Sequence, residues 1–155
     1  MHNGFYSELD ELLNEGEDAD FGFMENEVLG KDIKYNGRTF SAFNFLHGFC
    51  NVFAQVLNER YGYPVECIFN EEGRLIHCFC IDTSNGHLSF IDVRGKTDDY
   101  YEFISEFEDE VTYYDEYPVE NTKRFNCVPD DLLTDGEHYK EFANNLINDY
   151  PLYYH

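Results

Sequence analysis

Apolar residues recur at helical spacing along one central stretch of the chain. Between Phe49 and Tyr61 they stand three or four positions apart, a period that predicts an amphipathic helix. Gly48 precedes this stretch, and Gly62 follows it at the position where a left-handed residue commonly ends a helix. Cys50 therefore falls in the first turn, where the positive end of the helix dipole favours a thiolate.

The pattern changes to strand character after this helix. Residues 64–69 and 75–81 are short runs rich in β-branched and aromatic residues, and a third run follows the dipeptide Asn85-Gly86. The turn residues 70–73 connect the first two runs. Consecutive strands with short connections predict an antiparallel meander, which we expect to pack under the Cys50 helix.

The Asn85-Gly86 turn predicts how the last two strands pair. This dipeptide favours a type I′ hairpin, since both central residues need positive φ. The residue numbers of each facing pair then sum to 171, so that Phe79 lies opposite Asp92. His77 becomes a diagonal neighbour of Asp92 on the same face, within reach of a hydrogen bond.

The remaining sequence predicts helices on both sides of this core. We expect a short N-terminal helix over 8–14, a small hairpin over 33–40, a helical turn over 41–46 and a helix over 99–109 capped by Thr97 or Asp98. Residues 111–119 are expected as an edge strand or loop, 121–129 as irregular chain, and a last helix runs from 134 or 136 to 150 and ends before a tail, 151–155. The fold class is α+β, in a single domain over 1–155 with a core at 47–95.

Composition and charge limit the classes of partner. The 155 residues are 43% hydrophobic with 18% aromatic side chains, enough for one packed core, and no apolar run has the length of a membrane span. The acidic N-terminus lacks a signal peptide's basic start and apolar centre, so we expect a cytoplasmic protein. The net charge is −22, and residues 1–36 and 98–120 each carry 10 acidic side chains. This charge disfavours direct nucleic-acid binding and suits either solubility or a basic protein partner.

The cysteines are expected as free thiols. The chain has five, an odd number, and no secretion signal. The cluster His77-Cys78-x-Cys80 invites a zinc interpretation, but on a strand both cysteines face away from His77, and tetrahedral zinc needs converging ligands. We therefore expect neither a metal nor a cofactor.

Three residues together indicate nucleophilic catalysis. Cys50 alone is typical of a small core residue, and His77 and Asp92 alone are typical of structural positions. A thiol in a first turn, with an imidazole and a carboxylate on one face of a hairpin, instead fits a nucleophile, a general base and the group that orients the base. His87 is an alternative base, but its place at the hairpin tip predicts solvent exposure on the face away from Asp92.

These residues resemble the papain-like and transglutaminase-like superfamily of Cys-His-Asp proteins. The resemblance rests on Gly48-x-Cys50 with Phe53-Ala54 and Leu57 behind it, on His77 near the start of a strand, and on the run Phe90-Ile91-Asp92-Val93-Arg94-Gly95. It covers about a third of the chain, and small bacterial and phage proteins are the nearest comparison. It implies a helix-on-sheet fold with Cys50, His77 and Asp92 as a catalytic triad, and an oxyanion site that includes Asn44 or His47.

Two functions follow as hypotheses from different classes. The first is a cysteine hydrolase or acyltransferase that hydrolyses amides, deamidates glutamine or transamidates a protein substrate. The second is a non-enzymatic interaction or inhibitor protein whose acidic flanks bind a basic partner and imitate nucleic acid.

Overall fold

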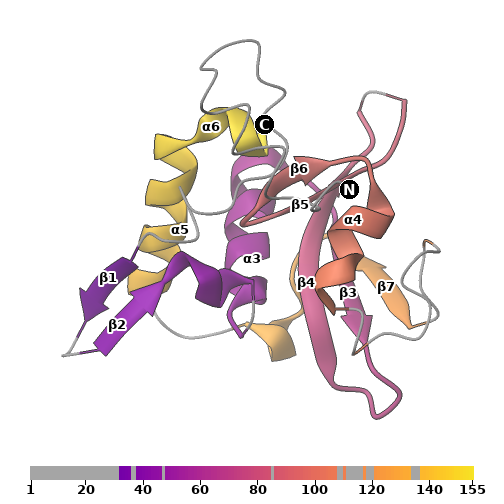
Figure 1. The fold of residues 1–155 in the computed structure, drawn as a ribbon, viewed down its shortest axis with the longest axis horizontal. Helices are drawn as coiled ribbons and strands as arrows, with labels where there is room; N and C mark the ends of the chain where they lie inside the picture. Colours follow the sequence, from indigo (N-terminus) through magenta and orange to yellow (C-terminus); the bar gives the residue numbers. More distant parts are fainter. Residues whose placement is uncertain are drawn as a thin grey trace.

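A five-stranded antiparallel sheet forms the centre of the fold, which is of the α+β class. The computed structural model describes residues 32–35, 38–46, 48–84, 86–107, 110, 117, 121–133 and 137–155. The strand order is β6-β5-β4-β3-β7. The strand bounds are β3 Val65–Phe69, β4 Leu75–Asp82, β5 Ser89–Asp92, β6 Gly95–Thr97 and β7 Thr122–Phe125. The predicted meander is present as β3, β4 and β5, which are consecutive in the chain and adjacent in the sheet (Figure 1).

Helix α3, Cys50–Tyr61, covers one face of the sheet and confirms the predicted central helix. It lies between the sheet and α5, Glu137–Asp149 (Figure 1). Gly62 ends it in the left-handed region with φ of 76°, a conformation that costs a residue without Cβ little energy. Cys80 of β4 faces this helix, because its Sγ donates to the Ala54 carbonyl at 3.4 Å.

The pairing of β4 with β5 confirms the register expected from the sequence. Cys80 pairs with Ile91, Ile81 with Phe90 and Asp82 with Ser89, so each pair sums to 171. The pairing ends at Asp82 and Ser89, and Gly86 has φ of 80°. Asn85 lies outside the described residues, so the expected type I′ turn stays a prediction.

The opposite face of the sheet is covered by α4, Tyr100–Ile104, and the following 3-10 turn η2, Ser105–Phe107. Within the expected helix over 99–109, residues 100–104 are α-helical and 105–107 form the 3-10 turn, and Phe103 and Phe107 are at 1% exposure or less. The expected cap is wrong: Asp99 is the N-cap, and its side chain accepts a hydrogen bond from the Glu102 N–H. Thr97 Oγ1 instead accepts from the Asp99 N–H.

The hairpin before the core has the expected form. Strands β1, Asp32–Tyr35, and β2, Arg38–Ser41, pair antiparallel, and the 3-10 turn η1, Ala42–Phe45, leads toward α3. The predicted helix over 8–14 lies outside the described residues, as does the stretch 111–119 except for Tyr117.

Two expectations about the C-terminal third are wrong. Residues 122–125 form β7 on the edge of the sheet beside β3, where we expected irregular chain. A further 3-10 turn, η3, follows at Asp130–Leu132. The expected tail forms the short helix α6, Pro151–Tyr154, with Pro151 in its first turn and with Tyr153 and Tyr154 buried.

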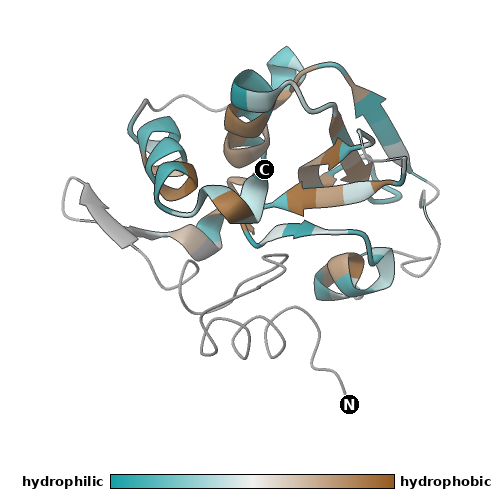
Figure 2. Cartoon of the chain, turned by 90° about the horizontal axis from the view of Figure 1, so that it is seen from above, coloured by the Kyte–Doolittle hydropathy of each residue, from teal (hydrophilic) through white to brown (hydrophobic). Residues whose placement is uncertain are grey.

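Hydrophobic residues are concentrated in the interior of this arrangement. Figure 2 shows brown segments in the central helix and strands and teal segments around the periphery. The core joins residues from α3, the central strands, α4, α5 and α6 in one cluster. None of the helices in the described ranges combines the length and the apolar character that a bilayer crossing requires.

Candidate active site

His77 and Asp92 form a buried hydrogen-bonded pair across β4 and β5. The His77 Nε2 and Asp92 Oδ2 atoms are 2.9 Å apart, and the side chains are 0% and 2% exposed. This contact confirms the diagonal neighbourhood predicted from the hairpin register. Because Nε2 is held by the carboxylate, Nδ1 is the ring nitrogen that a thiol has to meet for proton transfer.

Arg94 joins this pair from the turn between β5 and β6. Its Nη2 donates to Asp92 Oδ2 at 2.7 Å, its Nε lies 3.1 Å from both carboxylate oxygens, and its backbone N–H donates to Oδ1 at 2.8 Å. Burial alone would raise the pKa of Asp92, but the Arg94 charge and the His77 hydrogen bond outweigh it and hold that pKa well below its usual range. Asp92 is therefore ionised, as an orienting carboxylate must be.

Aromatic rings fix the plane of the imidazole. His77 stacks on Phe107 with ring centroids 4.3 Å apart and on Phe79 at 5.6 Å, and Phe103 lies 5.9 Å away. The Arg94 guanidinium lies 4.8 Å from the centroid of the Phe103 ring, and its Nη2 donates to the Phe103 carbonyl. The segment α4–η2 thus holds both partners of Asp92.

Cys50 begins α3, and its sulfur lies against the main chain of β4. Sγ accepts a hydrogen bond from the Cys78 N–H at 3.2 Å. The Ile81 N–H points to β3, because it donates to the Pro64 carbonyl, so the amides of the even-numbered residues of β4 point toward β5. Strand β5 pairs with β4 only as far as Ile91. Beyond that pair, the Cys50 sulfur is the acceptor for the Cys78 N–H, where a backbone carbonyl of β5 would otherwise stand.

The Cys50 thiol is neutral in this arrangement. Burial raises its pKa to about 12, although the Cys78 N–H lowers it, and the side chain is 4% exposed. The expected thiolate is therefore wrong for this state, because loss of water outweighs the helix dipole. The hydrogen bonds that lower the pKa of this thiol come from the backbone N–H groups of Cys78 and Asn51.

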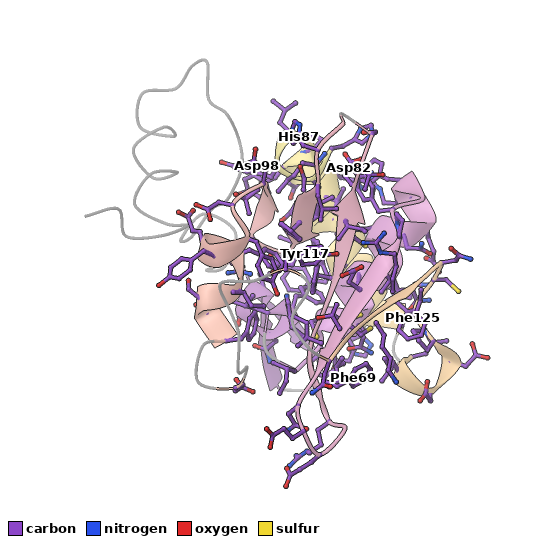
Figure 3. All side chains as sticks on the ribbon, turned by 90° about the vertical axis from the view of Figure 1, so that its right-hand side faces the viewer. Phe69, Asp82, His87, Asp98, Tyr117 and Phe125 are labelled. Carbon is purple, nitrogen blue, oxygen red and sulfur yellow. The ribbon has the colours of Figure 1, made fainter. Side chains whose placement is uncertain are left out.

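The other candidate residues have different outcomes. Asn44 Oδ1 accepts from Ser41 Oγ at 2.9 Å, and its backbone carbonyl accepts from the Phe49 N–H at 2.8 Å, so it supports the entry to α3. His47, the second oxyanion candidate, lies outside the described residues. The alternative base His87 is 61% exposed and 4.0 Å from Asp98, at the end of the molecule away from Phe69 and Phe125 (Figure 3).

The expected faces of β4 are confirmed by contacts. Cys78 and Cys80 lie on the α3 side, whereas His77 and Phe79 contact Phe103 on the α4 side. Within the described part of the chain, no group of three or more His, Cys, Asp or Glu side chains has a geometry that could hold a metal ion.

Sequence reasoning missed the role of Arg94 at this site. The side chain is fully buried, and its Nε and Nη2 contact the carboxylate of Asp92. The available signal in the sequence was the spacing Asp92-x-Arg94 at the end of a strand. Two residues at this spacing flank a tight turn, which brings their side chains together.

A cleft opens near the start of α3, on the side of the sheet where β7 lies. It measures about 450 Å³ and is lined by Phe69, Asn70, Glu71, Gly73, Asn121, Lys123, Phe125, Pro129, Asp131 and Leu132. The Leu132 carbonyl accepts a hydrogen bond from the side-chain amide of Asn51, the residue after Cys50. The wall of the cleft is thereby attached to the first turn of α3.

Comparison with known proteins gives no assignment. No protein-family model matches the chain, and no match is found among curated proteins or among solved structures. The function has to be argued from the site itself.

Proposed function

We propose that this chain is a papain-like cysteine hydrolase or acyltransferase that acts on amide groups of a protein substrate. The observation that carries the proposal is the buried His77–Asp92 hydrogen bond, 2.9 Å long, next to the point where Cys50 Sγ accepts from the backbone N–H of Cys78, the residue after His77. The helix on an antiparallel meander, with the histidine and the aspartate on adjacent strands, is the arrangement expected of that superfamily. Cys50, His77 and Asp92 act as nucleophile, general base and orienting group.

The raised pKa of Cys50 determines when its proton is transferred relative to attack on the substrate. With a pKa of about 12 the thiol does not ionise before attack at neutral pH. His77 therefore takes the proton as Sγ bonds to the carbonyl carbon, as a base does for a serine hydroxyl. The imidazolium then gives this proton to the leaving amine or ammonia, and Asp92 stabilises the positive ring throughout.

The second half-reaction returns the thiol. Water or a substrate amine attacks the thioester, and His77 accepts the proton of the attacking group and gives it back to the departing sulfur. Water yields hydrolysis or deamidation, and an amine yields transamidation. We assign stabilisation of the oxyanion to the backbone N–H of Cys50, the first residue of α3.

The 450 Å³ cleft beside α3 is the proposed approach for substrate. Its wall is bound to Asn51, the residue after Cys50, which places the cleft next to the first turn of α3. Both apolar and charged side chains line the cleft, which suits a polypeptide segment better than a small apolar ligand.

The experiment compares wild type with Cys50→Ala and with the matched control Cys80→Ala. Each protein is incubated with casein, and ammonia release, incorporation of a fluorescent amine and peptide release are measured. We expect Cys50→Ala and His77→Ala to lose more than 100-fold in the activity that wild type shows, and Cys80→Ala to retain it. Circular dichroism confirms folding of each variant. Equal rates for folded Cys50→Ala and wild type would exclude the proposal.

The alternative, an acidic interaction protein, has no structural observation in its favour. Of the two acidic segments, 1–36 lies outside the described residues except for 32–35, and 98–120 is described only at 98–107, 110 and 117. Steep loss of binding to a basic protein with rising salt would support this alternative.

A further inference from the structure

Cys67 and Cys78 face each other across strands β3 and β4 of the sheet. The residues are direct partners in the pairing of β3 with β4, and their Sγ atoms are 3.5 Å apart. Both are free thiols, 0% and 1% exposed. Neither of these two thiols takes part in the mechanism proposed above.

The type of strand pair suits a covalent bond. The Ile81 N–H donates to the Pro64 carbonyl, so Pro64 and Ile81 are a hydrogen-bonded pair. In an antiparallel ladder every second pair is of this kind, and the pairs between them are not hydrogen-bonded. Cys67 and Cys78 belong to the intervening set, and the Cys78 N–H accordingly points away from β3 to Cys50 Sγ. Cα atoms of such pairs lie about 4.5 Å apart, within the range of 4.4–6.8 Å that a disulfide requires.

Cys80 and Cys127 lack this geometry. Cys80 shares the face with Cys78, but its strand partner is Val65 and its Sγ donates to the Ala54 carbonyl. Cys127 is exposed and lies beyond β7. The chain therefore contains one directly facing pair and, in Cys80, a buried thiol two positions away that serves as a control.

We propose that Cys67 and Cys78 are a modification site that closes reversibly to a cross-strand disulfide under a two-electron thiol oxidant. One S–S bond forms and two S–H bonds break; the oxidant takes up both hydrogens, so that a diazene becomes a hydrazine or a peroxide becomes water. The bond joins β3 to β4 at the centre of the sheet. The proposal does not depend on the catalytic role of Cys50.

Full burial determines how the pair reacts. Thiols at 0% and 1% exposure meet an oxidant only when the sheet opens locally, so closure is slow, and reduction of the finished bond is slow for the same reason. The disulfide would therefore form under sustained exposure to an oxidant and not during a brief one. The disulfide also lowers the conformational entropy of the unfolded chain between Cys67 and Cys78, so the oxidised protein melts at a higher temperature.

The experiment uses the full chain with Cys127→Ser, which prevents intermolecular bonding. The native protein is incubated with diamide and its intact mass is measured; the remaining free thiols are then blocked before digestion and peptide analysis. We expect a loss of about 2 Da, a peptide that links Cys67 to Cys78, and recovery of the original mass after dithiothreitol. The control Cys80→Ser retains the linked peptide, and Cys67→Ser loses it.

Two results would overturn the proposal. One is a native protein that keeps all four thiols under diamide at pH 8, while denatured protein oxidises. The other is a linked peptide that joins Cys50 or Cys80 instead of Cys67. The mapping of the parent protein decides both points even where Cys67→Ser does not fold.

Discussion

The Arg94 guanidinium holds both oxygens of Asp92, although the two residues are only two positions apart in the chain. The turn after β5 brings the arginine back over the strand end, where the Phe103 carbonyl and ring receive it. Asp92 thus has two cationic or proton-donating partners, His77 and Arg94, inside a fully buried site. The orientation of His77 depends on a carboxylate whose position Arg94 determines.

Removing the arginine charge should destabilise the fold strongly. Arg94→Leu leaves the buried carboxylate of Asp92 with His77 as its remaining side-chain partner, and breaking such a buried pair costs about 3–5 kcal/mol of unfolding free energy. Urea titration followed by circular dichroism measures this. The control Arg74→Leu removes an exposed arginine and should change stability by less than about 0.5 kcal/mol. A loss below 1 kcal/mol for Arg94→Leu would show that the pair contributes little.

Stability should fall as the pH drops below about 4. Burial acts to raise the pKa of Asp82, but hydrogen bonds from Lys96 and Ser84 lower it from 3.8 to about 2. A carboxyl with a depressed folded pKa stabilises the protein above its unfolded pKa, and this contribution is lost as the pH falls from 3.8 toward 2. Asp92, whose pKa is lowered further, adds a loss that continues to lower pH.

Urea midpoints measured between pH 6 and pH 2.5 test this dependence. The variant Asp82→Asn should show a shallower decline than wild type, since one of the linked protons is absent. Parallel curves for the two proteins would contradict the assigned pKa of Asp82.

The sequence predicted the part of the fold that local rules determine. The Asn85-Gly86 dipeptide gave the pairing of β4 with β5, and this register alone placed Asp92 beside His77. The apolar period and Gly62 gave α3 with its correct end. These features depend on turn chemistry and side-chain periodicity over a few residues.

Long-range contacts determine what the sequence could not show. Strand β7 has the sequence TKRF, with exposed Lys123 and Arg124, and lacks an alternating pattern. It is anchored by partners distant in the chain, because Arg124 and Tyr117 both contact the buried carboxylate of Glu66. The neutral state of Cys50 likewise follows from burial, which depends on the whole tertiary structure.

The C-terminal residues should be essential for stability. Tyr154 is fully buried, its hydroxyl donates to the Val93 carbonyl at 2.7 Å, and its ring lies 5.2 Å from that of Phe53. Tyr154→Ala should cost about 3–5 kcal/mol through the cavity it leaves. Tyr154→Phe should cost about 1–3 kcal/mol, because the Val93 carbonyl loses its donor.

The adjacent Leu152 provides the control for this prediction. Its side chain is 68% exposed, so Leu152→Ala should leave the thermal midpoint nearly unchanged. If Tyr154→Ala unfolds at the same urea concentration as Leu152→Ala, the packing of α6 in the structure is wrong.

The cysteines should react with iodoacetamide in an order set by exposure and pKa. Cys127 is the exposed thiol, whereas burial raises the pKa of Cys50 to about 12. Only the thiolate is alkylated, so at pH 7.5 Cys127 should react at least 100-fold faster than Cys50 in the free protein.

The Cys50 rate should still rise about tenfold per pH unit at pH 9, where the rate of an ordinary thiol begins to level off. Peptide mass spectrometry of timed samples gives each rate. The opposite order, with Cys50 faster than Cys127 at pH 7.5, would contradict this prediction. It would show that the Cys50 thiol of the free protein is often exposed to solvent and ionised. Proton transfer to His77 would then precede attack on the substrate instead of accompanying it.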